Sequence, residues 1–369
     1  GKLRPRTAYV FGWIYWWARM ASVIPSIVNF LTHAPVLGTV MKAIAGIAPQ
    51  RTLPKFADTT FRRWFTNKNK HAAAPAKRPR VMLWPDTFNN FFLPETLVAG
   101  MEVLEAAGFE VIIPRQSLCC GRPLYDFGML KTAKRMLRNI IESLDKEINE
   151  GTPIVGLEPS CVAVFRDELY GLFPNDEKAK KLHNQVFTLA EFLAEQAPDF
   201  TVPKLNGEAI VQAHCHHNAI MKMDCDSDLL KKSGLHFDIL NSGCCGMAGY
   251  FGYEKGRHYD VSVKSGERVL LPAVRKAKKE TLIIADGFSC REQIEQQTDR
   301  RALHLAEVLH MSLREKGLIG TSHPERYIDA HKLRDPAKRM KIIIFSAAVA
   351  ALATALIFKM KRNEVQVIK

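Results

Sequence analysis

Cys119-Cys120-Gly121 recurs in this sequence as Cys244-Cys245-Gly246, and each triplet stands in the middle of a matching block of sequence. Neighbouring cysteines rarely form a disulfide with each other, because the short ring requires a distorted peptide. They do place two soft thiolate ligands on one turn of backbone, and the adjacent glycine lets the chain approach something bulky. The two triplets therefore predict a metal or iron–sulfur site that is present twice.

The similarity between the two halves extends over four blocks in the same order. Residues 81–86, 108–113, 152–161 and 189–193 match residues 210–215, 234–239, 281–290 and 305–309. Runs of β-branched residues bounded by Gly or Pro predict buried strands, and segments such as 94–107 and 131–144 have helical spacing. An internal repeat of this kind sets the architecture of a chain. We expect an α/β fold with duplicated βαβ lobes and mainly parallel strands.

The cysteines of each half fall just after a predicted strand. The carboxyl ends of strands are where open α/β sheets build their sites, so distant segments can converge there. The second half offers four thiolates and three neighbouring histidines, whereas the first half offers three thiolates and a carboxylate. The candidate ligands are Cys215, Cys244, Cys245 and Cys290 with His214, His216 and His217, and Cys119, Cys120 and Cys161 with Asp86. Cys225 lies on an expected helix, and we interpret it as a small buried apolar residue.

Longer motifs give the pattern a family resemblance. They are residues 118–128 (Leu-Cys-Cys-Gly-Arg-Pro-Leu-Tyr-Asp-Phe-Gly), 156–161, 214–217 (His-Cys-His-His) and 285–292. The sequence resembles the cysteine-rich CCG domain of heterodisulfide reductase and of the glycolate oxidase iron–sulfur subunit. From about Arg4 to His310 it looks like the carboxyl-terminal region of fused FAD-dependent D-lactate and D-2-hydroxyglutarate dehydrogenases. The resemblance implies tandem CCG domains that bind iron–sulfur clusters.

The sequence departs from the family pattern at two positions. Glu158 and Gly287 stand where the family has the first cysteine of Cys-x-x-Cys. The five-cysteine, non-cubane cluster is therefore not expected, whereas the second half retains enough thiolates for a 4Fe-4S cubane or for zinc. The first half needs Asp86, Glu158 or an outside ligand to complete the coordination shell of a metal. Otherwise it is a degenerate site that keeps the fold but binds no metal.

The resemblance also implies modules that this sequence does not contain. It has no dinucleotide fingerprint, no recognisable flavin-binding segment and no Cys-x-x-Cys-x-x-Cys run, and it begins at Gly1. In the family these modules lie upstream, so we expect upstream flavin (FAD) and ferredoxin-like domains as partners. The chain by itself is then not catalytic on hydroxyacids. Arg122 and Arg291, beside cysteines, are interpreted as neutralising cluster charge.

The carboxyl-terminal end carries a membrane signal. Residues 342–358 contain no charge and are flanked by Lys and Arg on both sides, and as a helix they span roughly 25 Å. A buried Ala-rich helix is the alternative. The net charge of +14 favours anionic lipid, and no nucleic-acid motif accompanies it. Because paired free thiolates require a reducing compartment, we expect a cytoplasmic protein held at the cytoplasmic side of a membrane by this helix.

These observations divide the sequence into seven parts. They are a helical connector (1–65), a linker (66–80), the first CCG lobe (81–205), the second CCG lobe (206–315), a basic linker (316–341), a transmembrane helix (342–358) and a basic tail (359–369). The function we expect is an electron-transfer module that passes electrons from a flavin to a quinone or another acceptor. The alternatives are a heterodisulfide-reductase-like thiol–disulfide redox protein and a structural zinc domain that docks partners.

Overall fold

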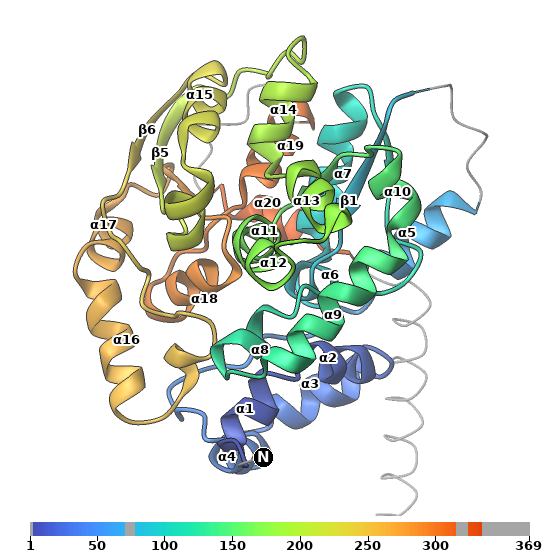
Figure 1. Ribbon diagram of the computed structural model, residues 1–369. Helices are drawn as coiled ribbons and strands as arrows, with labels where there is room; N and C mark the ends of the chain where they lie inside the picture. The colour runs from blue at the N-terminus through green and yellow to red at the C-terminus, as the bar shows by residue number, and fades with distance from the viewer. Residues whose placement is uncertain (1–2, 71–77, 315–323, 334–369) are drawn as a thin grey trace, which may run out of the picture. The chain divides into compact units, whose positions relative to one another are not determined.

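The computed structural model describes residues 3–70, 78–314 and 324–333 (Figure 1). Residues 1–332 form one compact unit, to which the following account is confined. The expected transmembrane helix and basic tail lie outside the described residues. Among the residues that are described, no single helix has the length and apolarity needed to cross a bilayer. One pair of helices, bent by 87°, has both properties together: α3 (Pro25–His33) and α4 (Pro35–Ala45).

Two small parallel sheets form the centre of the described chain. The first has the strand order β2-β1-β3-β4 and the second the order β6-β5-β7. All the pairings are parallel, with Leu83 opposite Val155 in the first sheet and Ile210 opposite Ile283 in the second. The mixed α/β class and the parallel strands predicted from the repeat are therefore confirmed. The strands are β1 (Arg80–Trp84), β2 (Glu110–Ile112), β3 (Ile154–Gly156), β4 (Val186–Phe187), β5 (Gly207–Val211), β6 (Leu235–Ile239) and β7 (Leu282–Ile284).

Helices cross between the parallel strands, as such connections require. Their starts follow local signals: Pro94 opens α7, and Thr188 with Glu191 forms a capping box on α14. In the first half they are α6 (Thr87–Phe91), α7 (Pro94–Ala106), α8 (Arg122–Asp126), α9 (Leu130–Ser143), α10 (Asp145–Asn149), α11 (Pro159–Ala163), η1 (Val164–Glu168), α12 (Leu169–Leu172), α13 (Glu177–Gln185) and α14 (Leu189–Gln196). In the second half they are η2 (His217–Met221), α15 (Asp224–Lys232), η3 (Phe251–Tyr253), α16 (Arg257–Glu267), α17 (Leu270–Lys276), α18 (Phe288–Gln297) and α19 (Leu305–Arg314).

Helices also occupy much of the described part of the segments expected to flank the lobes. Residues 66–69 belong to a helix rather than to the expected linker, because Thr60 caps that helix and Phe61 and Phe65 are buried. A short helix also lies inside the expected basic linker. These flanking helices are α1 (Arg6–Phe11), α2 (Ile14–Ala21), α3, α4, α5 (Phe61–Asn69) and α20 (Arg326–Ala330).

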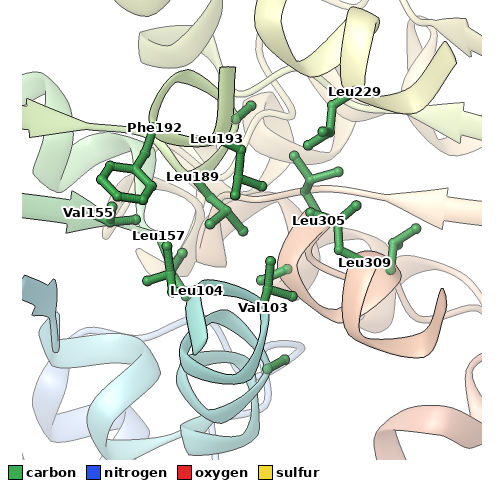
Figure 2. Close-up of a cluster of buried hydrophobic side chains, with 14 of the residues drawn as sticks. Val103, Leu104, Val155, Leu157, Leu189, Phe192, Leu193, Leu229, Leu305 and Leu309 are labelled. Carbon is green, nitrogen blue, oxygen red and sulfur yellow. The ribbon is translucent and has the colours of Figure 1, made fainter. Parts of the chain in front are cut away.

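One apolar core joins the two sheets. It contains Leu83 of β1 and Val155 of β3 together with Val211 of β5 and Ile284 of β7. Figure 2 shows part of this core, where leucine and valine side chains from α7, α14, α15 and α19 lie close together. Because both sheets bury residues in the same cluster, the carboxyl ends of their strands are held in a fixed relation.

Glu95, in the first turn of α7, gives this core a pH dependence. Burial raises the pKa of its carboxyl group from 4.5 to about 7. The stability contributed by the protonated group is therefore complete below the unfolded value of 4.5 and is lost as the pH rises through 7. We expect Glu95→Gln to raise the free energy of unfolding by about 1–3 kcal/mol at about pH 8 and to leave it unchanged at about pH 4. Urea denaturation at both pH values checks this; equal stabilities at the higher pH would contradict it.

Candidate metal centre

The four cysteines of the second half come together from three separate segments. Cys215 follows β5, Cys244 and Cys245 follow β6, and Cys290 lies in the first turn of α18 after β7. Their thiols form a hydrogen-bonded series in which Cys215 contacts Cys244, Cys244 contacts Cys245, and Cys245 contacts Cys290. Cys245 and Cys290 are buried, whereas Cys215 is exposed. The cluster thus has a buried end and an end open to solvent.

The electrostatics of this group favour one thiolate over the others. Hydrogen bonds from Cys215 and Cys245 and from the Gly246 amide lower the pKa of Cys244. The same hydrogen bonding raises the pKa of Cys215 and of Cys245, because a single negative charge is shared among the three sulfurs. A metal ion or cluster supplies the positive charge that lets the remaining thiols lose their protons.

Only glycine fits at position 246, both because its backbone has a positive φ and because a larger side chain would clash. Its φ is +92°, and a Cβ added there would lie 2.1 Å from the carbonyl oxygen of Ser262. This conformation lets the Gly246 amide donate to Cys244 Sγ at 3.4 Å. Gly121 repeats the arrangement in the first half, with φ +77° and its amide 3.4 Å from Cys119 Sγ. In both triplets the glycine amide therefore donates to the first sulfur, a contact that orients a metal ligand.

The three cysteines of the first half also meet, and all three are buried. The sulfur atoms of Cys120 and Cys161 are 3.0 Å apart, and the Thr87 hydroxyl donates to Cys119 Sγ at 3.3 Å. The hydrogen bond to Cys120 and burial together raise the pKa of Cys119. The pKa of Cys120 is raised by the contact with Cys161 and by burial, although the hydrogen bond from Cys119 lowers it. In contrast to the second half, no thiol of this set has a lowered pKa.

Asp86 and Glu158 are used by the protein in ways that limit them as ligands of the first set. Asp86 caps α6: its Oδ1 accepts the amides of Phe88 and Asn89, and its Oδ2 accepts Asn89 Nδ2. Burial raises the pKa of this carboxyl to about 6. Glu158 caps α11 through Ser160, and its Oε2 accepts the Phe288 amide of α18 at 2.8 Å. Glu158 thus links the two halves.

Two of the three histidines lie beside Cys215, and the third faces a carboxylate. One ligand atom from each of His214, Cys215 and His216 lies within 4.8 Å of the other two. His214 is buried, and burial together with its two histidine neighbours lowers its pKa to about 3, so the imidazole is neutral. A Cβ at Gly287 would lie 2.2 Å from the His214 ring, which explains why no cysteine fits at position 287. His216 lies 3.9 Å from Cys215 Sγ through its Nδ1. His217 faces Asp226 instead, with 3.1 Å between Nε2 and Oδ2.

The two arginines beside the cysteines have carboxylate or polar partners within the protein. Arg122 pairs with Glu168 and with Asp126, the latter at 3.6 Å. Arg291 is buried and donates to Thr96 Oγ1 at 3.1 Å and to Asn89 Oδ1 at 2.8 Å, so it ties α18 to α6 and α7. The structure therefore gives Arg291 a role in joining the halves that the sequence interpretation did not include.

Two contributions from the amino-terminal segment were missed by the sequence interpretation. Arg51 is fully buried, donates to the carbonyl of Gly252 and the hydroxyl of Ser262, and brings positive charge towards Cys245. Tyr15 donates to the Ser117 carbonyl at 2.6 Å. With Ile14 and Trp16 it lines a hollow that also contains all three first-half cysteines. An arginine and a tyrosine remote from any motif carry no sequence signal of this kind.

A model of a known protein family matches part of the first half. Residues 87–166, which include Cys119, Cys120 and Cys161, match the family model described as a cysteine-rich domain, CCG. This part of the chain is similar to a CCG domain. The triplet that gives the domain its name is Cys119-Cys120-Gly121, and the second triplet lies beyond the matched residues. The resemblance inferred from the cysteine motifs is confirmed.

The relatives of this chain include two dehydrogenases and a lactate utilization protein. One subunit of the anaerobic glycerol-3-phosphate dehydrogenase of Escherichia coli K12 is 26% identical over 292 residues, covering 78% of this chain and 72% of that protein. The D-2-hydroxyglutarate dehydrogenase of Pseudomonas putida is 30% identical over 239 residues, covering 64% of this chain and 23% of that enzyme. Lactate utilization protein A of Bacillus subtilis is 28% identical over 245 residues, covering 63% of this chain and 99% of that protein.

Proposed function

We propose that this chain is the iron–sulfur electron-transfer module of an FAD-linked dehydrogenase. The observation that carries the proposal is the convergence of Cys215, Cys244, Cys245 and Cys290 at the carboxyl ends of adjacent parallel strands. Four thiolates suit a 4Fe-4S cubane, and zinc accepts the same set. A cluster, when bound, supplies a centre that gains and loses one electron.

The surrounding residues suit a buried redox centre with one accessible edge. Cys245 and Cys290 hold the inner side away from water, and Arg51 places buried positive charge near Cys245. The Gly246 amide donates to sulfur, and such donors raise a cluster's reduction potential. Cys215 is exposed, so electrons exchange with a partner on that side.

We also propose that the two sheets arose from duplicated CCG lobes, 81–205 and 206–315. In each sheet the first strand along the chain lies between the second and the third, giving β2-β1-β3 and β6-β5-β7. Each half then places its Cys-Cys-Gly triplet after the second strand, with glycine at positive φ. The shared order and the shared glycine conformation support a common origin.

The relatives support a division of labour between this chain and a flavin-bearing partner. Their names include three different compounds: glycerol 3-phosphate, D-2-hydroxyglutarate and lactate. A segment shared by such proteins does not determine the compound oxidised, so we place substrate oxidation on upstream flavin and ferredoxin-like domains. A D-2-hydroxyacid such as lactate, 2-hydroxyglutarate or glycolate is the substrate class we propose.

An exposed apolar surface supports docking of such a partner. Large apolar side chains on α2, α3 and α4 are turned to solvent, including Phe30 at 70% and Val36 at 78% exposure. Apolar patches of this kind mark interfaces with proteins or membranes. We propose that residues 1–65 pack against the upstream domains, with membrane lipid as the second candidate.

The isolated chain is expected to bind iron and sulfide but not to oxidise hydroxyacids. After anaerobic reconstitution, it should show visible iron–sulfur absorption and no turnover of D-lactate, D-2-hydroxyglutarate or glycolate with a dye acceptor. Addition of the flavin protein should then support electron transfer to a dye or quinone. Reconstituted protein without iron or sulfide would overturn the proposal, and turnover without a flavin protein would mean that a hydride acceptor exists in this chain.

A thiol–disulfide enzyme is a second candidate, favoured by one observation in the first lobe. The sulfur atoms of Cys120 and Cys161 lie 3.0 Å apart in a buried position. This dithiol is close enough to form a disulfide with small movements. Reduction of a disulfide substrate by reduced viologen dye, lost in Cys161→Ser, would favour this function. Zinc bound without iron and lost in Cys245→Ser would instead favour the structural zinc domain.

For location we propose the cytoplasmic face of a membrane, with residues 342–358 as the anchor. Deleting everything after Arg339 should move most of the protein from the membrane fraction to the supernatant without changing its metal content. Sedimentation of membranes followed by metal analysis checks both points. Continued sedimentation would transfer the anchoring role to the apolar surface of α2–α4 or to a partner, and loss of metal would show that the tail packs against the core.

A further inference from the structure

A second group of ligands lies outside the four cysteines. His217 follows β5, Asp226 lies on α15, and Asp286 follows β7. One ligand atom from each lies within 4.8 Å of the other two. The set contains nitrogen and oxygen but no sulfur, so its chemistry differs from that of the cysteine site.

His217 is the unexplained member of this group. Its side chain is 2% exposed, yet its Nε2 has no hydrogen-bond partner. The atom lies 3.1 Å from Asp226 Oδ2, at the distance of an ion pair but not in hydrogen-bond geometry. Against the effect of burial, the neighbouring Asp226 carboxylate raises the pKa of His217. A buried nitrogen without a well-aligned hydrogen bond costs free energy, and this one lies close to two carboxylates, an arrangement that suits a bound cation. Two ligands bound to the same ion at about 2 Å each lie about 3 Å apart, which is the separation found here.

His304 supports the group without belonging to it. Its Nδ1 accepts the Ala306 amide at 2.9 Å, so its Nε2 carries the proton and donates to the Leu157 carbonyl at 2.8 Å. Both ring nitrogens are therefore used. Asp286 Oδ1 accepts the Leu305 amide at 2.8 Å, which fixes the orientation of that carboxylate.

The group lies where the two halves meet. Two small hollows share His217, Asp226 and Asp286. One hollow is completed by second-half residues such as Gln212. The other is completed by first-half residues such as Thr188. An ion here would connect the ends of β5 and β7 with α15, against the first half.

We propose that His217, Asp226 and Asp286 bind one divalent cation, Zn²⁺ or Mn²⁺, at a site separate from the cysteine centre. Imidazole and carboxylate ligands together suit these ions, and two carboxylates balance the charge of the cation. By binding His217, the cation holds in place the segment after β5 that carries Cys215. Its function is to fix the junction of the two halves.

Mn²⁺ is the probe that distinguishes this site from the cysteines, because thiolates bind it poorly. The full chain is titrated with Mn²⁺, and loss of the electron paramagnetic resonance signal of the free ion measures binding. We expect one Mn²⁺ per chain, displaced by Zn²⁺, with unchanged iron content. Asp226→Asn and Asp286→Asn should each weaken binding by at least about tenfold.

Asp224→Asn is the matched control, because Asp224 is an exposed carboxylate on the same helix. It removes the same charge and should leave Mn²⁺ binding within about twofold of the wild type. Circular dichroism establishes that each variant is folded. The wild-type measurement is decisive if a variant does not fold. Absence of Mn²⁺ and Zn²⁺ binding by the wild-type chain would overturn the proposal and leave His217 as a protonated partner of Asp226, and equal weakening by all three variants would reduce the effect to surface charge.

Discussion

Replacing Cys245 with serine is expected to abolish the iron–sulfur signal of this protein, lowering bound iron by at least about tenfold. Cys245 is 4% exposed and is the sulfur that contacts both Cys244 and Cys290. A serine hydroxyl is a harder and far less acidic ligand than a thiol, so it does not replace the thiolate. Cys215→Ser should have the same effect. Iron and sulfide per chain, with visible absorption after anaerobic reconstitution, give the measurement.

Cysteine replacements in the first half are expected to remove much less iron. Cys161→Ser should lower bound iron by less than half, because the first set has three thiols and no lowered pKa among them. Cys225→Ser is the control for loss of a thiol: Cys225 lies on α15, away from both sets, and should retain all the iron. Equal losses from Cys161→Ser and Cys245→Ser would show that both lobes hold clusters.

Replacing Arg291 with methionine is expected to lower the free energy of unfolding by about 3–5 kcal/mol. The guanidinium is 6% exposed, and its removal leaves Asn89 and Thr96 without their donors at the junction between the halves. Burial raises the pKa of the Asp86 and Glu158 carboxyls and the positive charge of Arg291 opposes this rise, so both carboxyls lose a neighbouring positive charge. Urea denaturation monitored by fluorescence measures the change.

Two further variants separate this role from a general effect of charge. Arg135→Met, on the exposed side of α9, should change stability by no more than about 0.5 kcal/mol. Arg291→Lys should recover less than half of the loss, because an ammonium group does not reproduce the fork that reaches two acceptors. If Arg291→Met lost iron while its stability stayed at the wild-type level, Arg291 would act on cluster charge, as its position beside Cys290 indicated in the sequence.

Much of the fold could be predicted because its signals are local. The run Val81 to Trp84 is apolar throughout, as a strand buried on both faces requires, and it forms β1. Residues 94–107 have helical spacing and begin with proline, and they form α7. The Cys-Cys-Gly triplets were recognisable because the glycine conformation and the two sulfurs are set by three consecutive residues.

The partners of the polar side chains could not be predicted in the same way. Asp86 stands where the other half has Cys215, which made it a candidate ligand, but its oxygens are occupied by α6. Asn89, three residues later, offers a side-chain amide, and a buried carboxylate takes the nearest donors because leaving it unpaired is costly. His217 shows the same limit, since its sequence neighbours are possible ligands of the cysteine site while its nearest carboxylate is on α15.

The sequence by itself determined the parallel α/β class, the position of strands such as β1 and the two cysteine triplets, because these depend on periodicity and on adjacent residues. Only the tertiary structure decided which distant groups meet across the junction: Glu158 with the Phe288 amide, Arg291 with Asn89, and Arg51 beside Cys245. The physical reason is that a buried charge must find a partner wherever packing brings one, and packing brings the buried Arg51 to Ser262, 211 positions along the chain.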